Sequence, residues 1–555
     1  EREYLPVRES RGNWKDRFGE DYVTFNITIG SAKEKFGDDL AKKVVHQELQ
    51  QMLDKQVWRP VSHQEISEKN GNIKVISSKM FLKEKLTPDG KFDKLKARLV
   101  AGGHQQIRHY MEDVSSPTAS ISSIFIVAAL AARENRHVST LDITGAYLNA
   151  SMPENVEVYM RLDSVLAEEL VKIDPSYKSY RNKNGAIVVR LLKALYGCIE
   201  SAKLWFKHIE KSLNDLGFTS NQVDQCVFNR GVGEDQVTVV VYVDDLLITC
   251  RKDAIKKQVI ESIESIYNSI TVDEGKILSY LGMTFNFSNE GEVVITMEKY
   301  INEIINEYNV KGFSATPATN DLFKINESEK LNQESKIKYH SMVAKLLYLA
   351  KRIRPDLLTA ISFLSSRVND PTKEDWNKLH RVLRYVRKTK ELSMRLRIGI
   401  LLIIFAYLDA AHAVHTNCLS QSGITIFVGD AMVYAKSSKQ RLNTKSSTES
   451  ELVTLSDGTS QVVWTKLFLE SQGYDVGAAV IFQDNISTMK MIKNGKGTGE
   501  KTRHINPRFF FVRNRIQNGD VIIRYKPTEL MIADMLTKPK QGEEFKILRS
   551  KLLGL

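Results

Sequence analysis

Residues 237–250 read VTVVVYVDDLLITC, two apolar runs that are interrupted only by Asp244 and Asp245. This pattern predicts two buried strands joined by a tight turn that carries both carboxylates. Asp is common in turns, so an ordinary surface turn is one interpretation. Two adjacent carboxylates at the end of buried strands repel each other unless a cation accompanies them. Mg²⁺ prefers such carboxylates together with substrate phosphates. The hairpin therefore indicates a metal site.

A third acidic residue ends a separate apolar strand. Asp142 lies in LDITGAYLN (residues 141–149), and the apolar residues before it predict a strand over Val138–Ile143. Two-metal phosphoryl transfer requires carboxylates from separate strands that converge on one point. We therefore expect Asp142 to join Asp244 and Asp245 in one catalytic group.

Further motifs narrow this expectation to a family. KARLVAGG (residues 96–103) precedes LDITGAYLN, and LYGC (residues 195–198) lies between LDITGAYLN and YVDD. In this order the motifs resemble the reverse transcriptases of Ty1/copia-type LTR retrotransposons. The resemblance implies a right-hand polymerase with fingers, palm and thumb. It makes Asp142, Asp244 and Asp245 the catalytic acids and metal ligands.

The same resemblance implies roles in substrate binding. Tyr147 matches a steric gate that excludes the ribose 2′-hydroxyl. The alternative is a tyrosine that only packs in the core. Tyr196 and Gly197 resemble the loop under the incoming nucleotide. Lys96 and Arg98 are two apart on a predicted strand and share one face, so either can bind the triphosphate. Which of the two dominates stays open, and a solvated basic strand edge is the alternative.

Three further residues resemble the primer grip, a hairpin that places the primer end. These are Leu281, Gly282 and Met283, and their place after YVDD supports the assignment. Residues 294–325 are expected to form the thumb, and the polar stretch Leu322–Lys338 is expected to be a linker. The apolar spacing over Tyr339–Thr389 predicts a helical region.

Beyond residue 398 the pattern changes to strands and helices of a mixed α/β domain, with acidic residues at strand ends and near a helix start. The segments KSSTESEL (445–452), QDN (483–485) and ADMLTK (533–538) resemble a copia-type RNase H. The resemblance implies that four carboxylates hold two metal ions around an RNA phosphate. They are Asp409, Glu451, Asp484 and Asp534.

A pair of glutamates and a histidine of this domain are further candidates for a functional role. Glu449 and Glu451 are two apart on a predicted helix, so only one should face the metals, and the apolar run after Glu451 favours that residue. His504 lies about thirty residues before Asp534. That position is too early for the histidine that assists many RNase H enzymes, so we expect a structural or substrate-contacting role.

The fold class predicted is an α+β / α/β multidomain protein with four parts. These are fingers and palm (1–291), thumb and linker (292–338), a helical connection (339–397) and an RNase H-fold domain (398–555). The net charge of +12 and the pI of about 9.1 suit a polyanionic partner. The four cysteines form no CxxC pair, which indicates reduced thiols. The longest apolar stretches are too short to cross a bilayer, and no membrane partner is expected.

The expected function is reverse transcription by an RNA- and DNA-dependent DNA polymerase with RNase H activity. Expected partners are an RNA template, a DNA or tRNA primer, the RNA–DNA hybrid and dNTPs. Two Mg²⁺ ions are expected in each site, with Mn²⁺ as an alternative. The resemblance allows a homodimer, and it places the protein in the cytoplasm in virus-like particles, with the nucleus as an alternative. There are two other hypotheses. One is that only one of the two sites is active, and the other is that the chain is a domesticated, non-catalytic nucleic-acid-binding remnant.

Overall fold

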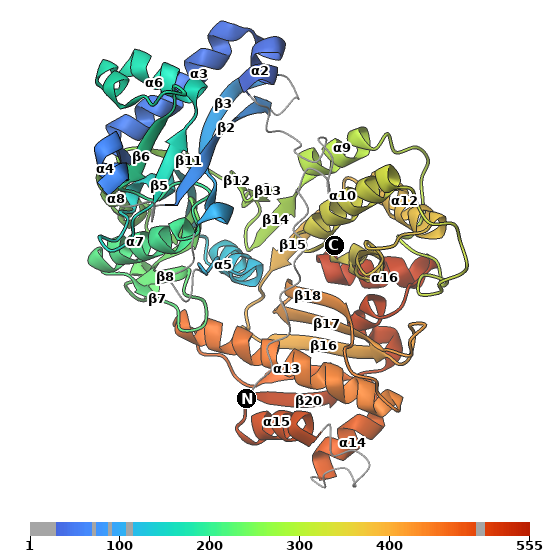
Figure 1. Ribbon diagram of the computed structural model, residues 1–555. Helices are drawn as coiled ribbons and strands as arrows, with labels where there is room; N and C mark the ends of the chain where they lie inside the picture. The colour runs from blue at the N-terminus through green and yellow to red at the C-terminus, as the bar shows by residue number, and fades with distance from the viewer. Residues whose placement is uncertain (1–28, 69–73, 87–91, 107–114, 495–505) are drawn as a thin grey trace, which may run out of the picture. The chain divides into compact units, whose positions relative to one another are not determined.

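The computed structural model describes residues 29–68, 74–86, 92–106, 115–494 and 506–555. They form two compact units, of which unit 1 holds residues up to 117 and residues 144–212. Unit 2 holds residues 118–143 and 213–555. Helices and sheets alternate in both units, which confirms an α+β multidomain fold (Figure 1). His504 lies outside the described residues. The domain boundaries expected at 291, 338 and 397 stay predictions.

Unit 1 contains a five-stranded sheet in the order β1-β6-β5-β2-β3. In β3 the residues Leu95, Ala97 and Leu99 are buried, whereas Lys96 and Arg98 between them are exposed. This period of two gives the strand one core face and one basic face. The strands are β1 (Trp58–Pro60), β2 (Val75–Leu86), β3 (Phe92–Ala101), β5 (Tyr159–Leu162) and β6 (Ile187–Leu191).

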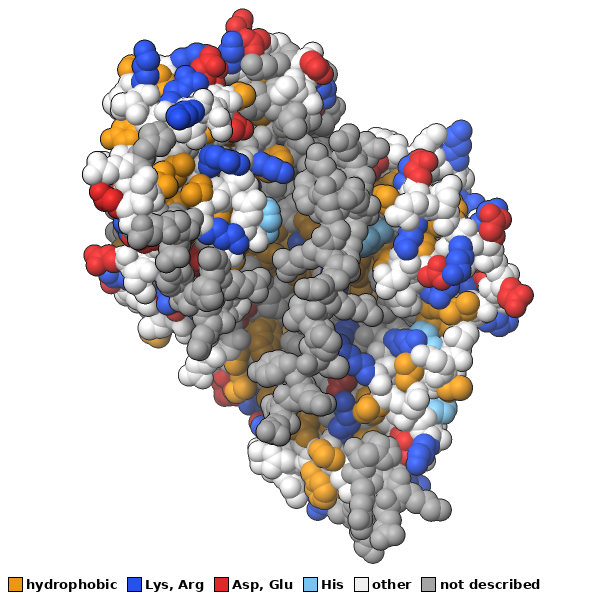
Figure 2. Space-filling view, viewed as in Figure 1, with side chains coloured by type: hydrophobic (Ala, Val, Ile, Leu, Met, Phe, Trp, Pro, Cys, Tyr) orange, Lys and Arg blue, Asp and Glu red, His pale blue; other side chains and the backbone are white. Residues whose placement is uncertain are grey.

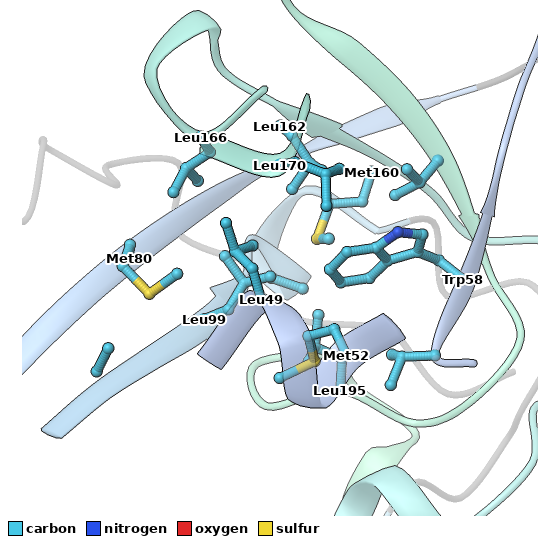
Figure 3. Packing of buried hydrophobic residues seen from close by; sticks show 14 of the residues in the cluster. Leu49, Met52, Trp58, Met80, Leu99, Met160, Leu162, Leu166, Leu170 and Leu195 are labelled. Carbon is cyan, nitrogen blue, oxygen red and sulfur yellow. The ribbon is translucent and has the colours of Figure 1, made fainter. Parts of the chain in front are cut away.

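The core of unit 1 lies between this sheet and α3 (Asp38–Asp54). Leu49 and Met52 are three apart on α3, so both face the sheet. They pack near Trp58 and Leu99 (Figure 3). The other helices that lie in unit 1, or begin there, are α2 (Ile29–Phe36), α4 (His63–Glu68), α6 (Ser164–Ile173) and α7 (Ser201–Asp215).

The first sheet of unit 2 has the order β11-β4-β10-β9-β8-β7. The hairpin predicted over Val237–Cys250 is confirmed as β9 (Val237–Tyr242) and β10 (Asp245–Cys250). Helix α5 (Ile121–Arg133) is apolar on all sides and is buried accordingly. The remaining elements are β4 (His137–Ile143), β7 (Thr219–Ser220), β8 (Val227–Arg230), β11 (Ile270–Glu274) and α8 (Asp253–Tyr267).

A second sheet of unit 2 has the order β12-β13-β14-β15, and β15 comes from a distant part of the chain. The expected linker over Leu322–Lys338 is wrong from Gln333 onward, because α10 begins there. Asn332 caps that helix by accepting a hydrogen bond of 2.8 Å from Ser335 N. The elements are β12 (Ile277–Tyr280), β13 (Met283–Asn286), β14 (Glu292–Thr296), β15 (Met394–Arg397), α9 (Glu298–Glu307), α10 (Gln333–Ala350), α11 (Leu358–Ser365) and α12 (Lys373–Lys388).

The third sheet of unit 2 has the order β18-β17-β16-β19-β20, with β16, β19 and β20 parallel to one another. The long helix α13 (Ser447–Ser471) packs on β16. A Cβ at Gly458 would lie 2.5 Å from Leu408, so glycine permits this close packing. The elements are β16 (Ile404–Ala411), β17 (Gln421–Val428), β18 (Ala431–Lys439), β19 (Ala479–Gln483), β20 (Val521–Tyr525), α14 (Ile486–Asn494), α15 (Asn506–Gln517) and α16 (Gly542–Leu553).

Buried polar contacts join the first and third sheets of unit 2. Tyr474, which follows α13, donates a hydrogen bond of 2.7 Å to Glu134 and accepts one of 3.1 Å from Arg136. Gln236 donates a hydrogen bond of 2.8 Å to the carbonyl oxygen of Gln472. Such contacts are costly to break where the polar groups are shielded from water.

The surface carries side chains of both charges. Figure 2 shows Lys and Arg side chains interspersed with Asp and Glu side chains on the face in view. Within the described residues, no helix has both the length and the apolar content that a membrane crossing requires.

Candidate active sites

The first acidic group lies in unit 2, where β4 and β10 run side by side. The antiparallel register places Asp142 directly opposite Asp245. The amide of Ile143 donates a hydrogen bond of 3.0 Å to the carbonyl oxygen of Asp244, which fixes the turn against β4. Val243, in the turn, has a φ of 59°, which is rare for a β-branched residue. Such strained residues gather at functional sites.

The charges of these acids act on one another. Burial raises the pKa of Asp245 to about 6, and the negative charges of Asp244 and Asp142 add to the rise. A carboxyl group with a raised pKa and two acidic neighbours favours a bound cation, because the cation offsets the repulsion. The structure therefore brings together all three acids predicted for the polymerase site.

The residues predicted to bind the nucleotide lie in unit 1. Tyr147 sits on a short 3-10 helix (Ala146–Asn149), and its ring contacts that of Tyr196 edge-on at 4.7 Å between centroids. The guanidinium of Arg98 lies 4.1 Å from the centroid of the Tyr196 ring. Lys96, by contrast, lines a hollow beside α3. The structure thus gathers Arg98, Tyr147 and Tyr196.

Gly197 allows two segments of unit 1 to approach closely. Its φ is 90°, and a Cβ there would lie 2.2 Å from the carbonyl oxygen of Ala101. A Cβ at Gly103 would lie 1.9 Å from the carbonyl oxygen of Gly197. Any side chain at either position would separate the end of β3 from the loop that carries Tyr196.

The predicted primer-grip residues form the turn between β12 and β13. Leu281 and Gly282 have φ values of 52° and 75°, and Met283 begins β13 as a buried residue. The turn is thus a tight connection with both central residues in the left-handed region.

The second acidic group lies on the third sheet of unit 2. Asp409 comes from β16, Glu451 from α13 and Asp484 from the end of β19, and their ligand atoms lie within 4.8 Å of one another. Among the described residues, no other group of three acidic, His or Cys side chains gathers its ligand atoms this closely. Carboxylates at this spacing suit hard divalent cations.

The protein positions Glu451 and destabilises its charged form. Glu451 accepts a hydrogen bond of 3.2 Å from the amide of Ala410 and another of 3.2 Å from the side chain of Gln483. Burial raises its pKa well above the usual range, and Asp409 and Asp484 add to the rise. Burial likewise raises the pKa of Asp409 to about 6. The charges fit a cation site.

Glu449 takes a different position from Glu451. Its carboxylate accepts a hydrogen bond of 2.8 Å from the amide of Lys445, ahead of α13. The N-cap, Ser446, accepts in turn from the amide of Glu449 at 3.3 Å. Glu449 therefore stabilises the start of α13 instead of joining the acidic group.

Asp534 lies beside the group of three but is paired with lysines. It is buried on a 3-10 helix (Ile532–Leu536), and its carboxylate makes ion pairs with Lys538, at 2.8 Å, and with Lys540. Thr537 donates a hydrogen bond to Asp409. The role of Asp534 as a metal ligand stays a prediction. The two lysines are residues that the sequence argument missed, although the four-residue spacing of Lys538 from Asp534 was a signal.

Known proteins are similar to this chain over most of its length. A model of the family "Reverse transcriptase (RNA-dependent DNA polymerase)" matches residues 62–320, which include the first acidic group. The chain is also 28% identical over 515 residues to the "Retrovirus-related Pol polyprotein from transposon RE2" of Arabidopsis thaliana, which covers 89% of this chain and 34% of that protein. Residues 62–320 match the reverse transcriptase family, and over most of its length the chain is similar to Pol polyproteins of retrotransposons. The family resemblance expected from the motifs is confirmed.

Another relative is similar to this chain over nearly its whole length, including the C-terminal part. The "Transposon Ty1-NL1 Gag-Pol polyprotein" of Saccharomyces cerevisiae is 24% identical over 556 residues, 95% of this chain and 29% of that protein. The chain spans about a third of the length of these curated relatives. A solved foamy viral protease-reverse transcriptase in complex with RNA/DNA hybrid aligns over 90% of this chain and 55% of that one. It has 11% identity and a TM-score of 0.49, too low to add to the fold described above.

Proposed function

We propose that this chain synthesises DNA on RNA and DNA templates and cuts the RNA of RNA–DNA hybrids, as part of LTR-retrotransposon replication. The observation that carries the proposal is the opposition of Asp142 and Asp245 on neighbouring strands, next to Asp244, within the matched reverse transcriptase region. The substrates are an RNA template with a DNA or tRNA primer, and dNTPs.

At the polymerase site the acids are the ligands of a divalent metal pair. Mg²⁺ held there would activate the primer 3′-hydroxyl and support the leaving pyrophosphate. Asp142 and Asp244 would be the principal ligands, and Asp245, whose pKa is raised by burial and by the neighbouring acids, would complete the acidic group. Arg98 offers the triphosphate a planar cation, and Tyr147 closes the space that a 2′-hydroxyl needs.

At the RNase H site Asp409, Glu451 and Asp484 form the donor set. The two hydrogen bonds to Glu451 hold its oxygens in place before any ion arrives, so little reorganisation is needed. Lys538, drawn to Asp534, lies among the same negative charges, which raise its pKa against the opposing effect of burial. It provides a counter-charge at the edge of the site.

DNA synthesis from a primed RNA template in Mg²⁺ tests the polymerase proposal. Asp244→Asn should abolish synthesis while the protein still binds the template–primer. Asp273→Asn is the matched control, because Asp273 is an exposed acid of β11 in the same sheet. If the wild-type protein binds the template–primer and synthesises nothing, the proposal of an enzyme is wrong and the hypothesis of a non-catalytic remnant is favoured.

A further inference from the structure

The turn between β12 and β13 adopts a backbone that its sequence does not favour. Leu281 has a φ of 52°, in the left-handed region that side chains other than glycine disfavour. Gly282 follows with a φ of 75°. A strained turn of this kind persists only where neighbouring groups hold it.

The strand before the turn is anchored near the first acidic group. Tyr280 is buried, and its hydroxyl lies 3.5 Å from the carbonyl oxygen of Val240 in β9. Burial raises the pKa of Tyr280, and the negative charge of Asp245 adds to the rise. The turn therefore begins one residue after a side chain that is anchored on β9, the strand that leads to Asp244 and Asp245.

The other side of the turn is held by α10. The hydroxyl of Tyr348 donates a hydrogen bond of 3.1 Å to the carbonyl oxygen of Leu281. A Cβ at Gly282 would lie 3.1 Å from the same hydroxyl. One side chain of α10 therefore contacts both residues of the turn.

Two neighbours fix the ring of Tyr348 in turn. The ring of Tyr300 in α9 lies 5.1 Å from it between centroids, and the guanidinium of Arg352 lies 3.4 Å from its centroid. An aromatic contact on one hand and a cation on the other restrict the ring to one position. The hydroxyl of Tyr348 is thus a fixed donor.

We propose that Tyr348 is a positioning residue for the primer end: its hydrogen bond to Leu281 holds the β12–β13 turn between α10 and β9, the strand that leads into the turn with Asp244 and Asp245. The inference rests on the proposed polymerase function and on the primer-grip role predicted for Leu281, Gly282 and Met283. A loosened turn leaves the nucleotide site and the acids in place but aligns the primer 3′-hydroxyl less often. Since catalysis depends steeply on such alignment, the rate of nucleotide addition falls while dNTP affinity is retained.

Single-turnover addition of one dNTP to a primed template tests this role. Tyr348→Phe keeps the ring and removes the hydrogen bond, and the maximal rate should fall by about three- to tenfold. The dNTP concentration at half-maximal rate and the rate of RNA cutting should not change. Tyr300→Phe is the matched control, because it also loses one hydrogen bond to a backbone carbonyl, that of Lys345 at 3.2 Å, but none to the turn.

A double-mutant cycle with Gly282→Ala tests the contact itself. The added methyl group meets the Tyr348 hydroxyl, so Gly282→Ala should slow addition less in the Tyr348→Phe background than in the wild type. Equal rates for Tyr348→Phe and Tyr300→Phe, or equal effects of Gly282→Ala in both backgrounds, would overturn the inference. A wild-type protein that adds no nucleotide would instead contradict the proposed polymerase function. Failure of the inference about Tyr348 is therefore distinguishable from failure of the proposed function.

Discussion

Removing one charge from the second acidic group should stabilise the metal-free protein. The ligand atoms of Asp409, Glu451 and Asp484 lie within 4.8 Å of one another. Two unit charges at that distance repel by about 3.5 kcal/mol at an effective dielectric constant of about 20. The pKa of Asp409 is raised from 3.8 to about 6, and a shift of about two units corresponds to about 3 kcal/mol. Burial of the carboxyl group is the main cause of this shift, and the charges of Asp534 and Asp484 add to it.

The sign of the pH dependence follows from this shift. Folded Asp409 binds a proton more tightly than the unfolded chain does, so its contribution to stability falls as the pH rises from about 3.8 to about 6 and is constant above. Asp409→Asn removes this dependence, and the amide oxygen can still accept from Thr537. In EDTA the wild-type protein should therefore lose about 2–3 kcal/mol more than Asp409→Asn between about pH 4 and about pH 7.5.

Denaturant unfolding at both pH values, with and without Mg²⁺, measures this difference. Mg²⁺ should stabilise the wild type at the higher pH and leave Asp409→Asn nearly unchanged. Asp430→Asn is the control, because Asp430 lies exposed in the turn between β17 and β18. Parallel pH profiles for the wild type and Asp409→Asn would refute the argument that the folded protein destabilises the charged form of Asp409.

Three further predictions concern other parts of the chain. Tyr474→Phe leaves the buried carboxylate of Glu134 short of one donor, and it should destabilise unit 2 by about 1–3 kcal/mol and speed cleavage near residue 474 in limited proteolysis. Gly197→Ala places a Cβ 2.2 Å from the carbonyl oxygen of Ala101 and strains the backbone, and it should lower the unfolding free energy of unit 1 by at least about 2 kcal/mol in urea. Tyr147→Ala opens the space beside the incoming sugar, and it should raise the relative kcat/KM for ribonucleotides over deoxynucleotides by at least about tenfold in steady-state assays.

Local patterns predicted much of this architecture. The apolar runs around Asp244 and Asp245 predicted β9 and β10, and the apolar residues before Asp142 predicted β4, which begins one residue earlier than expected, at His137. These elements depend on neighbouring residues, which a sequence displays directly. The start of α10 was missed because its first turn is polar and is stabilised by a cap at Asn332 instead of by apolar spacing.

Contacts between residues that are distant in the sequence were harder to predict from it. The motif order indicated that Asp142 and Asp245 meet, but only the pairing of β4 with β10 shows that they lie directly opposite. The lysine partners of Asp534 and the hydrogen bond from Tyr348 to Leu281 depend on side-chain packing that no periodicity records. The resemblance named candidate residues, and the structure supplied their neighbours.

The central claim is that one chain carries two separate metal-dependent activities. A single reaction with a labelled primer and an end-labelled RNA template, in Mg²⁺, follows DNA synthesis and RNA cutting together. The account predicts that Asp244→Asn abolishes only synthesis and that Asp484→Asn abolishes only cutting. Loss of both activities in either variant, with binding of the hybrid and folding intact, would contradict it.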